Sequence, residues 1–398
     1  MTDSALLAIL LAAIAGVVAG RVWAQARLRA DVRDRAPFRT STHYNQGLHY
    51  LTAGQTDLAI SELTKVGRDD PTTPEVLLIL GNLLRETGQV ERAIQVHQQL
   101  LGRTDLTRAE SVHARACLGM DFRKAGFVDR ATTAFEEVLA LDSRNLHALT
   151  GMLKLHEEQR HWGEAYELQT RLARLRKSDD SLVLGFLQCK LGEEAVRAGQ
   201  PEAADKAFRT ALSLDGRVFP AHLGIADLLM PRDPAAAARA LEKAIDAVPE
   251  RAYLAFERLA RAYAAAGQPS RFAALCERLI ANDPRDWRAR LALARQLASE
   301  GRLDEALGLL RRAVEANPQV LEVHLESWRT LQRLGTRGPG VDAYISTAES
   351  AVFYRDPHIC TACRYRADDM LWRCPHCHEW NTFVEERVGA ATGSARTE

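Results

Sequence analysis

A signature of small residues recurs through the middle of this 398-residue chain and restricts the type of fold it can adopt. In each copy, a glycine is followed by a second glycine seven positions later and by an alanine five positions beyond that. The clear copies are Gly47-Gly54-Ala59, Gly81-Gly88-Ala93, Gly119-Gly126-Ala131 and Gly192-Gly199-Ala204. The copies recur about every 34 to 39 residues, and a period of this length indicates a solenoid of stacked helical pairs rather than one compact core.

The pattern resembles the tetratricopeptide repeat, and the resemblance covers about residues 40–334, or roughly eight repeats. Small residues at the first and third positions let the two helices of a pair approach closely, and the middle glycine ends the first helix in a left-handed conformation. Phe135 and Phe208 follow their alanines by four residues and are predicted to pack between repeats. The resemblance implies a superhelix whose concave surface binds proteins or peptides.

Two copies depart from this pattern. The fourth has Leu153 and Arg160 where glycines are expected, and the seventh has Phe272 at the position of the alanine. We expect local irregularity at both, and also at residues 230–234, where two nearby prolines compress the turn.

Four of the seven cysteines crowd into 18 residues near the C-terminus: Cys360, Cys363, Cys374 and Cys377. Two Cys-x-x-Cys turns that face one another supply four thiolates at about 2.3 Å around a tetrahedral ion. The sequence therefore predicts one metal ion bound by these residues, either iron or zinc, because tetrahedral thiolate sites accept both. A filled coordination shell argues against a hydrolytic metal. His376 and His378 are alternative ligands, and a disulfide or a thioredoxin-type redox pair is the less favoured interpretation of the cysteines.

The segment around this cluster, residues 356–387, is too short to be stabilised by a core of its own. Bound metal must supply much of its folding free energy, on the order of 10–16 kcal/mol for zinc in comparable small domains. We expect some of its aromatic residues to cover the metal and others to dock the segment on the last repeats; these residues are Tyr365, Trp372, Trp380 and Phe383.

The N-terminus carries a separate apolar stretch. Residues 5–20 hold no charge. A helix of these residues is shorter than the roughly 30 Å hydrocarbon core of a bilayer, and its length approaches that thickness only when it extends through Arg21 to Trp23. Six arginines follow between positions 21 and 39, and no basic residue precedes the run. We therefore expect a transmembrane anchor at 1–23, a basic juxtamembrane linker at 24–39 and the bulk of the chain on the cytoplasmic side. A cleaved secretory signal and a buried soluble helix are the alternatives.

Composition and motifs argue against several functions. The 52 basic residues balance 52 acidic ones, and this zero net charge argues against nucleic-acid binding. Phosphate-loop and nucleophile-elbow motifs are absent, and His156 and His161 have one residue too many between them for a zinc-protease helix. Cys117, Cys189 and Cys276 lie singly in helical stretches and are predicted to be buried and inert, which suits a reducing compartment. The sequence thus predicts no catalytic residues and no enzyme.

The order of these parts resembles the lipopolysaccharide assembly protein B family across nearly the whole chain. Most of the specificity lies in the rubredoxin-like tail, where Trp372, Pro375, Trp380 and Thr382 surround the second Cys-x-x-Cys turn. The family's metal ligands correspond to the four clustered cysteines. A glycine that is common after the first turn of rubredoxin-like sites is Arg364 here, which brings into question the backbone hydrogen bonds to sulfur at that turn.

The expected architecture is mostly α: a tetratricopeptide-repeat superhelix with an N-terminal transmembrane helix and a small four-cysteine domain of the rubredoxin-like or zinc-ribbon type. One further short helix is predicted around 341–354, after a helix-breaking stretch rich in glycine. The expected domains after the anchor and linker are the array with its terminal helices at 40–354, the metal-binding domain at 355–388 and a flexible tail at 389–398.

The resemblance implies an inner-membrane adaptor that regulates lipopolysaccharide (lipid A) biosynthesis. Members of the family promote degradation of the deacetylase LpxC by the membrane protease FtsH and contact other lipopolysaccharide-assembly membrane proteins. Confinement to the membrane would raise the effective concentration of protease and client. Two other functions are open at this point, a general membrane-tethered scaffold for another complex and a rubredoxin-like electron carrier. The sequence leaves the oligomeric state open.

Overall fold

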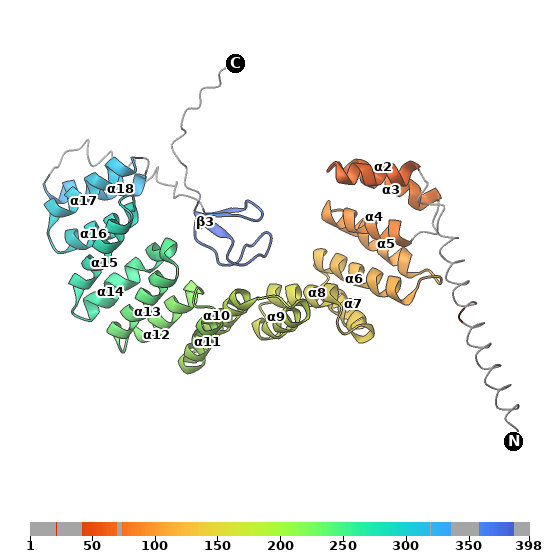
Figure 1. Ribbon diagram of the computed structural model, residues 1–398, viewed down its shortest axis with the longest axis horizontal. Helices are drawn as coiled ribbons and strands as arrows, with labels where there is room; N and C mark the ends of the chain where they lie inside the picture. Colours follow the sequence, from red (N-terminus) through yellow and green to blue (C-terminus); the bar gives the residue numbers. More distant parts are fainter. Residues whose placement is uncertain (1–20, 22–41, 70–73, 319, 336–357, 386–398) are drawn as a thin grey trace, which may run out of the picture. The chain divides into compact units, whose positions relative to one another are not determined.

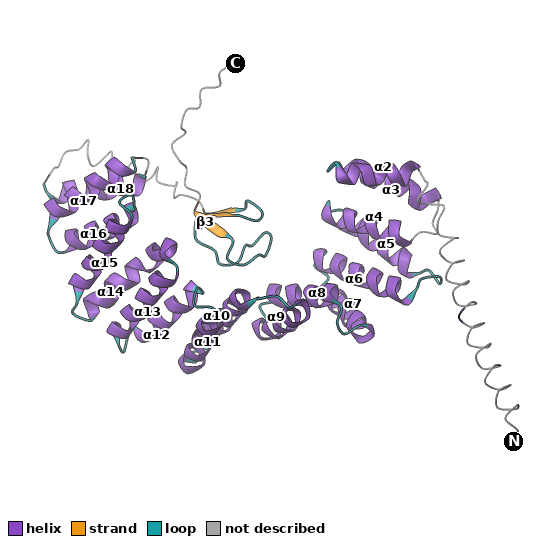
Figure 2. Cartoon of the chain, in the orientation of Figure 1, coloured by secondary structure: helices purple, strands orange, loops and turns teal. Residues whose placement is uncertain are grey.

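The computed structural model describes residue 21 and residues 42–69, 74–318, 320–335 and 358–385 (Figure 1). The expected anchor at 1–23 and linker at 24–39, the short helix at 341–354 and the tail at 389–398 lie outside these residues, with the exception of Arg21. Among the described residues, no helix is both long enough and apolar enough to cross a membrane. The described chain is mostly helical, as predicted, with one small sheet near its C-terminus (Figure 2).

Eight helical pairs follow one another along the described chain, which confirms the number of repeats expected. The pairs are α2 (Thr42–Thr52) with α3 (Thr56–Asp69), α4 (Pro74–Glu86) with α5 (Val90–Leu101), α6 (Arg108–Lys124) with α7 (Val128–Leu141), α8 (Leu146–Glu158) with α9 (Trp162–Arg176), α10 (Ser181–Arg197) with α11 (Pro201–Leu214), α12 (Phe219–Leu229) with α13 (Pro234–Ala247), α14 (Phe256–Ala265) with α15 (Pro269–Asn282) and α16 (Trp287–Ser299) with α17 (Leu303–Ala316). The 3-10 helix η2 (Pro249–Ala255) precedes α14, and α18 (Leu321–Arg333) follows the last pair.

The chain divides into two compact units, Met1–Arg176 and Lys177–Glu398. The first holds α2 to α9. The second holds α10 to α18 together with the four-cysteine segment.

The small residues of the signature lie where helices pack closely together, as the repeat pattern predicts. Gly119 in α6 lies against the ring of Phe135 in α7, and a Cβ added to Gly119 would be 2.6 Å from Cε1 of that ring. The same ring also contacts Gly151 in α8 and is fully buried. Phe208 is placed identically between Gly192 and Gly224. The aromatic side chain therefore fills the space between successive pairs, and this is possible only where its neighbours have no side chain.

The middle glycines end their helices with positive φ, as at Gly88 (83°) and Gly199 (70°). Arg160 takes the same position with φ of 62°, so the turn between α8 and α9 keeps its geometry despite lacking glycine. Our expectation of irregularity at Arg160 was therefore wrong. The backbone accepts the modest cost of a left-handed arginine because the packed helices on both sides determine the turn. At residues 230–234 the irregularity is real, because α12 ends without a left-handed residue and Asp233 caps α13.

The segment 358–385 forms a small ribbon built on a three-stranded sheet (Figure 2). The central strand β1 (His358–Cys360) pairs antiparallel with β2 (Arg366–Ala367) on one side and with β3 (Phe383–Glu385) on the other. Pairing of Cys360 with Phe383 brings the end of the ribbon back beside the first Cys-x-x-Cys turn.

Candidate metal centre

The four predicted ligands converge in the ribbon. The sulfurs of Cys360, Cys363, Cys374 and Cys377 all lie within 4.8 Å of one another. The separation is 3.7 Å between Cys360 and Cys377 and 3.6 Å between Cys363 and Cys374. Four sulfurs at about 2.3 Å from a tetrahedral ion are about 3.8 Å apart. The cluster therefore has the dimensions of a four-thiolate metal site.

Backbone amides point at the sulfurs, as expected for thiolates that carry charge. The amides of Ala362 and Cys363 bond to the sulfur of Cys360, and that of Tyr365 bonds to Cys363. At the second turn, the amide of His376 lies 3.4 Å from the sulfur of Cys374. These bonds form although Arg364 replaces a glycine, because Arg364 itself adopts a left-handed φ of 64°. The substitution leaves the turn intact.

The protonation of the thiols follows from burial and these hydrogen bonds. Burial alone would raise the pKa of Cys360, but the hydroxyl of Thr382 and two backbone amides outweigh it and lower that pKa to about 6. Desolvation raises the pKa of Cys363, and it raises that of Cys377 to about 12. A metal ion must displace the protons that these thiols hold, so metal affinity is expected to fall as the pH falls.

The two histidines near the site are not part of the thiol cluster. The ring of His376 stacks on Tyr365 with centroids 6.2 Å apart, and His378 occupies a left-handed turn position with φ of 61°. Phe383 packs on Cys360 and Cys374 and is fully buried. As predicted, one of the four aromatic residues covers the site.

The two tryptophans dock the ribbon on the repeats of its own unit. Trp380 stacks on Phe186 of α10 with a centroid distance of 5.6 Å, and Trp372 stacks on Phe219 of α12 at 6.1 Å. Trp372 also contacts Phe186 at 5.9 Å. We expected docking on the last repeats, but these contacts are with the first two pairs of the second unit. Phe186 and Phe219 replace none of the signature residues, so the repeat pattern did not reveal them.

Polar contacts surround this aromatic interface. Arg251 in η2 donates to Oδ1 of Asn381 at 2.5 Å, and its guanidinium lies over the ring of Trp372. The hydroxyl of Tyr253 lies 3.2 Å from Nε2 of His358. Arg288 in α16 forms an ion pair with Glu385 at the end of β3. The ribbon is thus held by the array at the start of β1, at the second turn and at the end of β3.

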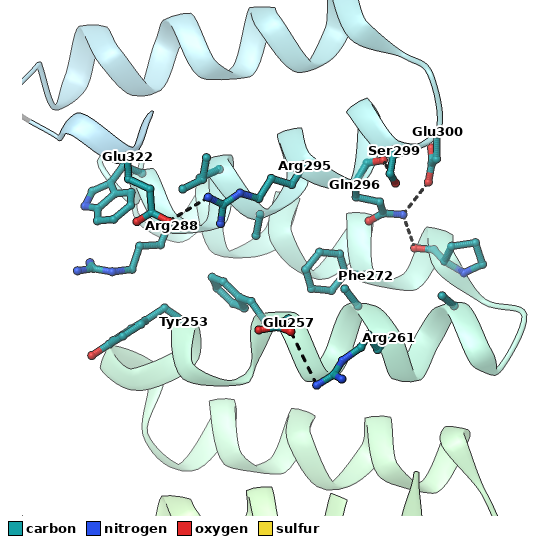
Figure 3. A pocket seen from close by; sticks show the side chains of 17 residues that line it. Tyr253, Glu257, Arg261, Phe272, Arg288, Arg295, Gln296, Ser299, Glu300 and Glu322 are labelled. Carbon is teal, nitrogen blue, oxygen red and sulfur yellow. Dashed lines mark hydrogen bonds and ion pairs between the residues drawn. The ribbon is translucent and has the colours of Figure 1, made fainter. Parts of the chain in front are cut away.

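A groove lies beside this interface, lined mainly by α14 and α16 (Figure 3). Its cavity volume is about 850 Å³, and its apolar surface includes Phe256, Phe272 and Leu291. Phe272 is the residue that replaces alanine in the seventh repeat, and it meets Phe256 edge to face at 6.3 Å. The irregularity expected in this pair is therefore an aromatic side chain at the position where the repeat signature has a small residue in a close helix contact.

Two ion pairs lie among the residues that line the groove. Arg295 contacts Glu322 at 2.9 Å, and Arg261 lies 3.9 Å from Glu257, as Figure 3 shows. The arginines and glutamates in the lining are equal in number: Arg261, Arg288 and Arg295 against Glu257, Glu300 and Glu322. The groove is apolar inside and electrically balanced at its edge.

Two other groups that the sequence singles out lie outside the ribbon. His156 and His161 have ring centroids 5.8 Å apart, and neither belongs to a cluster of potential metal ligands among the described residues. The lone cysteines are buried, and desolvation raises their pKa to about 11 for Cys117 and about 12 for Cys189 and Cys276. Thiols of this kind are poor nucleophiles at neutral pH.

One buried polar network is not evident from the sequence pattern. His97 occupies the position that Phe135 and Phe208 hold in other repeats, and its Nδ1 bonds to Asp121 at 2.5 Å. Asp121 also accepts from Arg85 at 2.9 Å, and both His97 and Asp121 are completely buried. The available signal was a histidine four residues after the repeat alanine Ala93.

Known proteins share both parts of this architecture. The family described as rubredoxin metal binding domain matches residues 358–385, and the tetratricopeptide repeat family matches 44–105, 232–284 and 258–320. Lipopolysaccharide assembly protein B of Escherichia coli strain K12 is 26% identical over 365 residues, which cover 87% of this chain and 89% of that protein. The protein of that name from Haemophilus influenzae is 24% identical, with coverage of 86% and 89%.

Among solved structures, the C-terminal part of a TPR repeat-containing protein from Cytophaga hutchinsonii is 12% identical with a TM-score of 0.43, and the match covers 71% of this chain and 98% of that one. The resemblance drawn from the sequence is confirmed by the two sequence comparisons. The chain is similar to lipopolysaccharide assembly protein B over most of its length, and its repeats and its ribbon match the tetratricopeptide repeat and rubredoxin metal binding domain families.

Proposed function

We propose that this chain is a non-enzymatic adaptor that regulates lipopolysaccharide synthesis at the bacterial inner membrane. In this proposal, residues 1–23 anchor the chain, residues 24–39 form the basic linker and the bulk of the chain is cytoplasmic. The array at 40–354 holds client and protease together, and the metal-binding domain at 355–388 completes the surface that binds them. The observation that carries the proposal is the similarity to lipopolysaccharide assembly protein B over 87% of the chain.

The partners we propose are the membrane protease FtsH and its substrate LpxC, together with other lipopolysaccharide-assembly membrane proteins. An adaptor of this kind needs no chemistry of its own. Holding two proteins at one membrane surface raises their effective concentration and accelerates their encounter. The buried, high-pKa lone cysteines and the closed four-thiol cluster are consistent with this role.

The test is the lifetime of the deacetylase in the host. Depletion of this protein should lengthen the half-life of LpxC, and re-expression of the wild-type chain should restore it. Re-expression of a chain that lacks residues 1–23 tests the anchor, because that form should leave the membrane fraction and restore degradation poorly. An LpxC half-life that is unchanged by depletion would reject the regulatory function.

The groove between α14 and α16 is the surface that we propose for a client. Its apolar floor and balanced charges suit an uncharged segment of a partner protein that inserts apolar side chains. Arginine in place of Ala260 or Ala292, which both line the groove, should reduce cross-linking to that partner in cells. Ala281→Arg, on the exposed end of α15, is the matched control and should leave cross-linking unchanged.

A further inference from the structure

Thr382 lies beside the four sulfurs without being one of the ligands. Its Oγ1 is 3.2 Å from the sulfur of Cys360, a residue that is completely buried. A thiolate that is bound to a metal carries no proton. In the loaded site the hydroxyl must therefore donate, and the sulfur must accept.

The position of Thr382 is determined on both sides by hydrogen bonds. Its carbonyl accepts from the amide of Thr361 at 2.8 Å and from the hydroxyl of Thr361 at 3.1 Å. The preceding residue, Asn381, has φ of 58°, donates its amide to the carbonyl of Trp372 and accepts from Arg251 of the array. The hydroxyl is thus held at the first Cys-x-x-Cys turn by contacts that do not involve the metal.

The charge of the site gives this hydrogen bond its importance. Four thiolates around a divalent ion leave two excess negative charges, and two of the four ligands, Cys360 and Cys374, are buried away from water. Buried charge is costly unless donors replace the lost hydration. Groups that bond to metal ligands in this way typically change metal affinity by about 10- to 100-fold when they are removed.

We propose that Thr382 is a positioning residue for the metal, whose hydroxyl disperses charge from the Cys360 thiolate and thereby tightens metal binding. The inference rests on the four-thiolate site and not on the adaptor function. It makes Thr382 a determinant of affinity and of the electronic properties of the bound ion, in addition to the four cysteines.

The test compares three variants of the full chain. Thr382→Val removes the hydroxyl and keeps the shape of the side chain, Thr382→Ser keeps the hydroxyl, and Thr133→Val removes an exposed hydroxyl that bonds to a carbonyl within α7, outside the metal site. Each is titrated with Zn²⁺ in competition with a chelator, and with Co²⁺ to record the sulfur-to-cobalt charge-transfer band. We expect Thr382→Val to weaken zinc binding about tenfold or more and to move the band to lower energy. The other two variants should resemble wild type.

Equal zinc affinities in Thr382→Val and wild type would overturn the inference. So would a weaker affinity without a shift of the band, because that result would assign the hydroxyl a packing role only. Thr382→Ala repeats the comparison if the valine variant does not fold. A wild-type chain that gave no tetrahedral Co²⁺ spectrum would reject the metal site, and the inference with it, while leaving the lifetime test of the adaptor function unaffected.

Discussion

At the scale of single residues, the packing between repeats depends on matched pairs of glycine and phenylalanine. Phe135 is enclosed by Gly119 and Gly151, and Phe208 by Gly192 and Gly224. Each ring occupies the volume that two missing side chains leave. Because the ring contacts a glycine on each of two helices, it cannot move away when one glycine gains a methyl group.

Gly119→Ala tests this arrangement. Alanine favours a helix by up to about 1 kcal/mol over glycine, whereas overpacking costs about 1–3 kcal/mol. We expect the steric cost to prevail and the free energy of unfolding in urea to fall. Gly163→Ala is the control, since no heavy atom lies within 4 Å of a Cβ added there. That variant should be as stable as wild type or slightly more so, and equal behaviour of the two variants would contradict the argument.

The buried network around Asp121 gives a second prediction at this scale. Asp121→Ala leaves the completely buried His97 and the partly buried Arg85 without their shared acceptor. Breaking a buried ion pair in this way costs about 3–5 kcal/mol. Asp205→Ala removes the partner of Arg209 on the surface of α11 and should cost less than about 1 kcal/mol. Thermal unfolding of the two variants separates these cases, and similar midpoints would refute a structural role for the network.

At the scale of elements, the ribbon differs from the helical pairs in what stabilises it. Its three strands contain two or three residues each, and its buried cluster consists of Cys360, Cys374 and Phe383. So small a core cannot compensate for the conformational entropy of some 28 residues. The helical pairs, in contrast, bury apolar faces against neighbours along the whole array.

Removal of metal should therefore unfold the ribbon while the array stays helical. With a strong chelator, or in the double variant Cys374→Ser plus Cys377→Ser, we expect the ribbon to become sensitive to protease. Tryptophan fluorescence should shift to longer wavelength as Trp372 and Trp380 leave Phe186 and Phe219. Far-UV circular dichroism should change little. A ribbon that resists protease after complete chelation would contradict the metal requirement.

At the scale of the second unit as a whole, the docked ribbon covers aromatic residues of the array. Phe186 is 1% exposed and Phe219 fully buried, and both stack on tryptophans of the ribbon. Loss of the ribbon would expose them, and each buried aromatic side chain contributes about 1.5–3 kcal/mol. A metal ion that folds the ribbon would thus also stabilise helices far from it in sequence.

Hydrogen exchange measures this coupling. In the Cys374→Ser plus Cys377→Ser variant, amides of α10 and α12 should exchange about tenfold faster or more, because local opening becomes less costly. Arg251→Ala should give a smaller effect at the same helices, since it removes one hydrogen bond and one cation–π contact. Helix α17 is the internal reference. Equal acceleration in α17 would indicate general destabilisation rather than loss of docking.

The sequence alone determined the parts that depend on short-range pattern. Glycine and alanine spacing specified the helical pairs, because a close helix contact needs small residues at fixed intervals. The two Cys-x-x-Cys turns specified which four sulfurs cluster, because four thiolates can complete a tetrahedron around one ion. The prediction at Arg160 failed because packed neighbours can hold a non-glycine residue in a left-handed turn.

Only the tertiary structure decided where the ribbon docks, that Phe272 and Phe256 line a groove, that His97 and Asp121 pair in the interior and that the Thr382 hydroxyl lies beside the Cys360 sulfur. These contacts join residues from different elements, from 22 to more than 150 positions apart in all but one case. The Phe256–Phe272 pair is the exception, and it is visible only once its two helices are placed. Spacing along one helix or turn carries no information about which distant surfaces meet, because that choice is made by shape and burial in the folded chain.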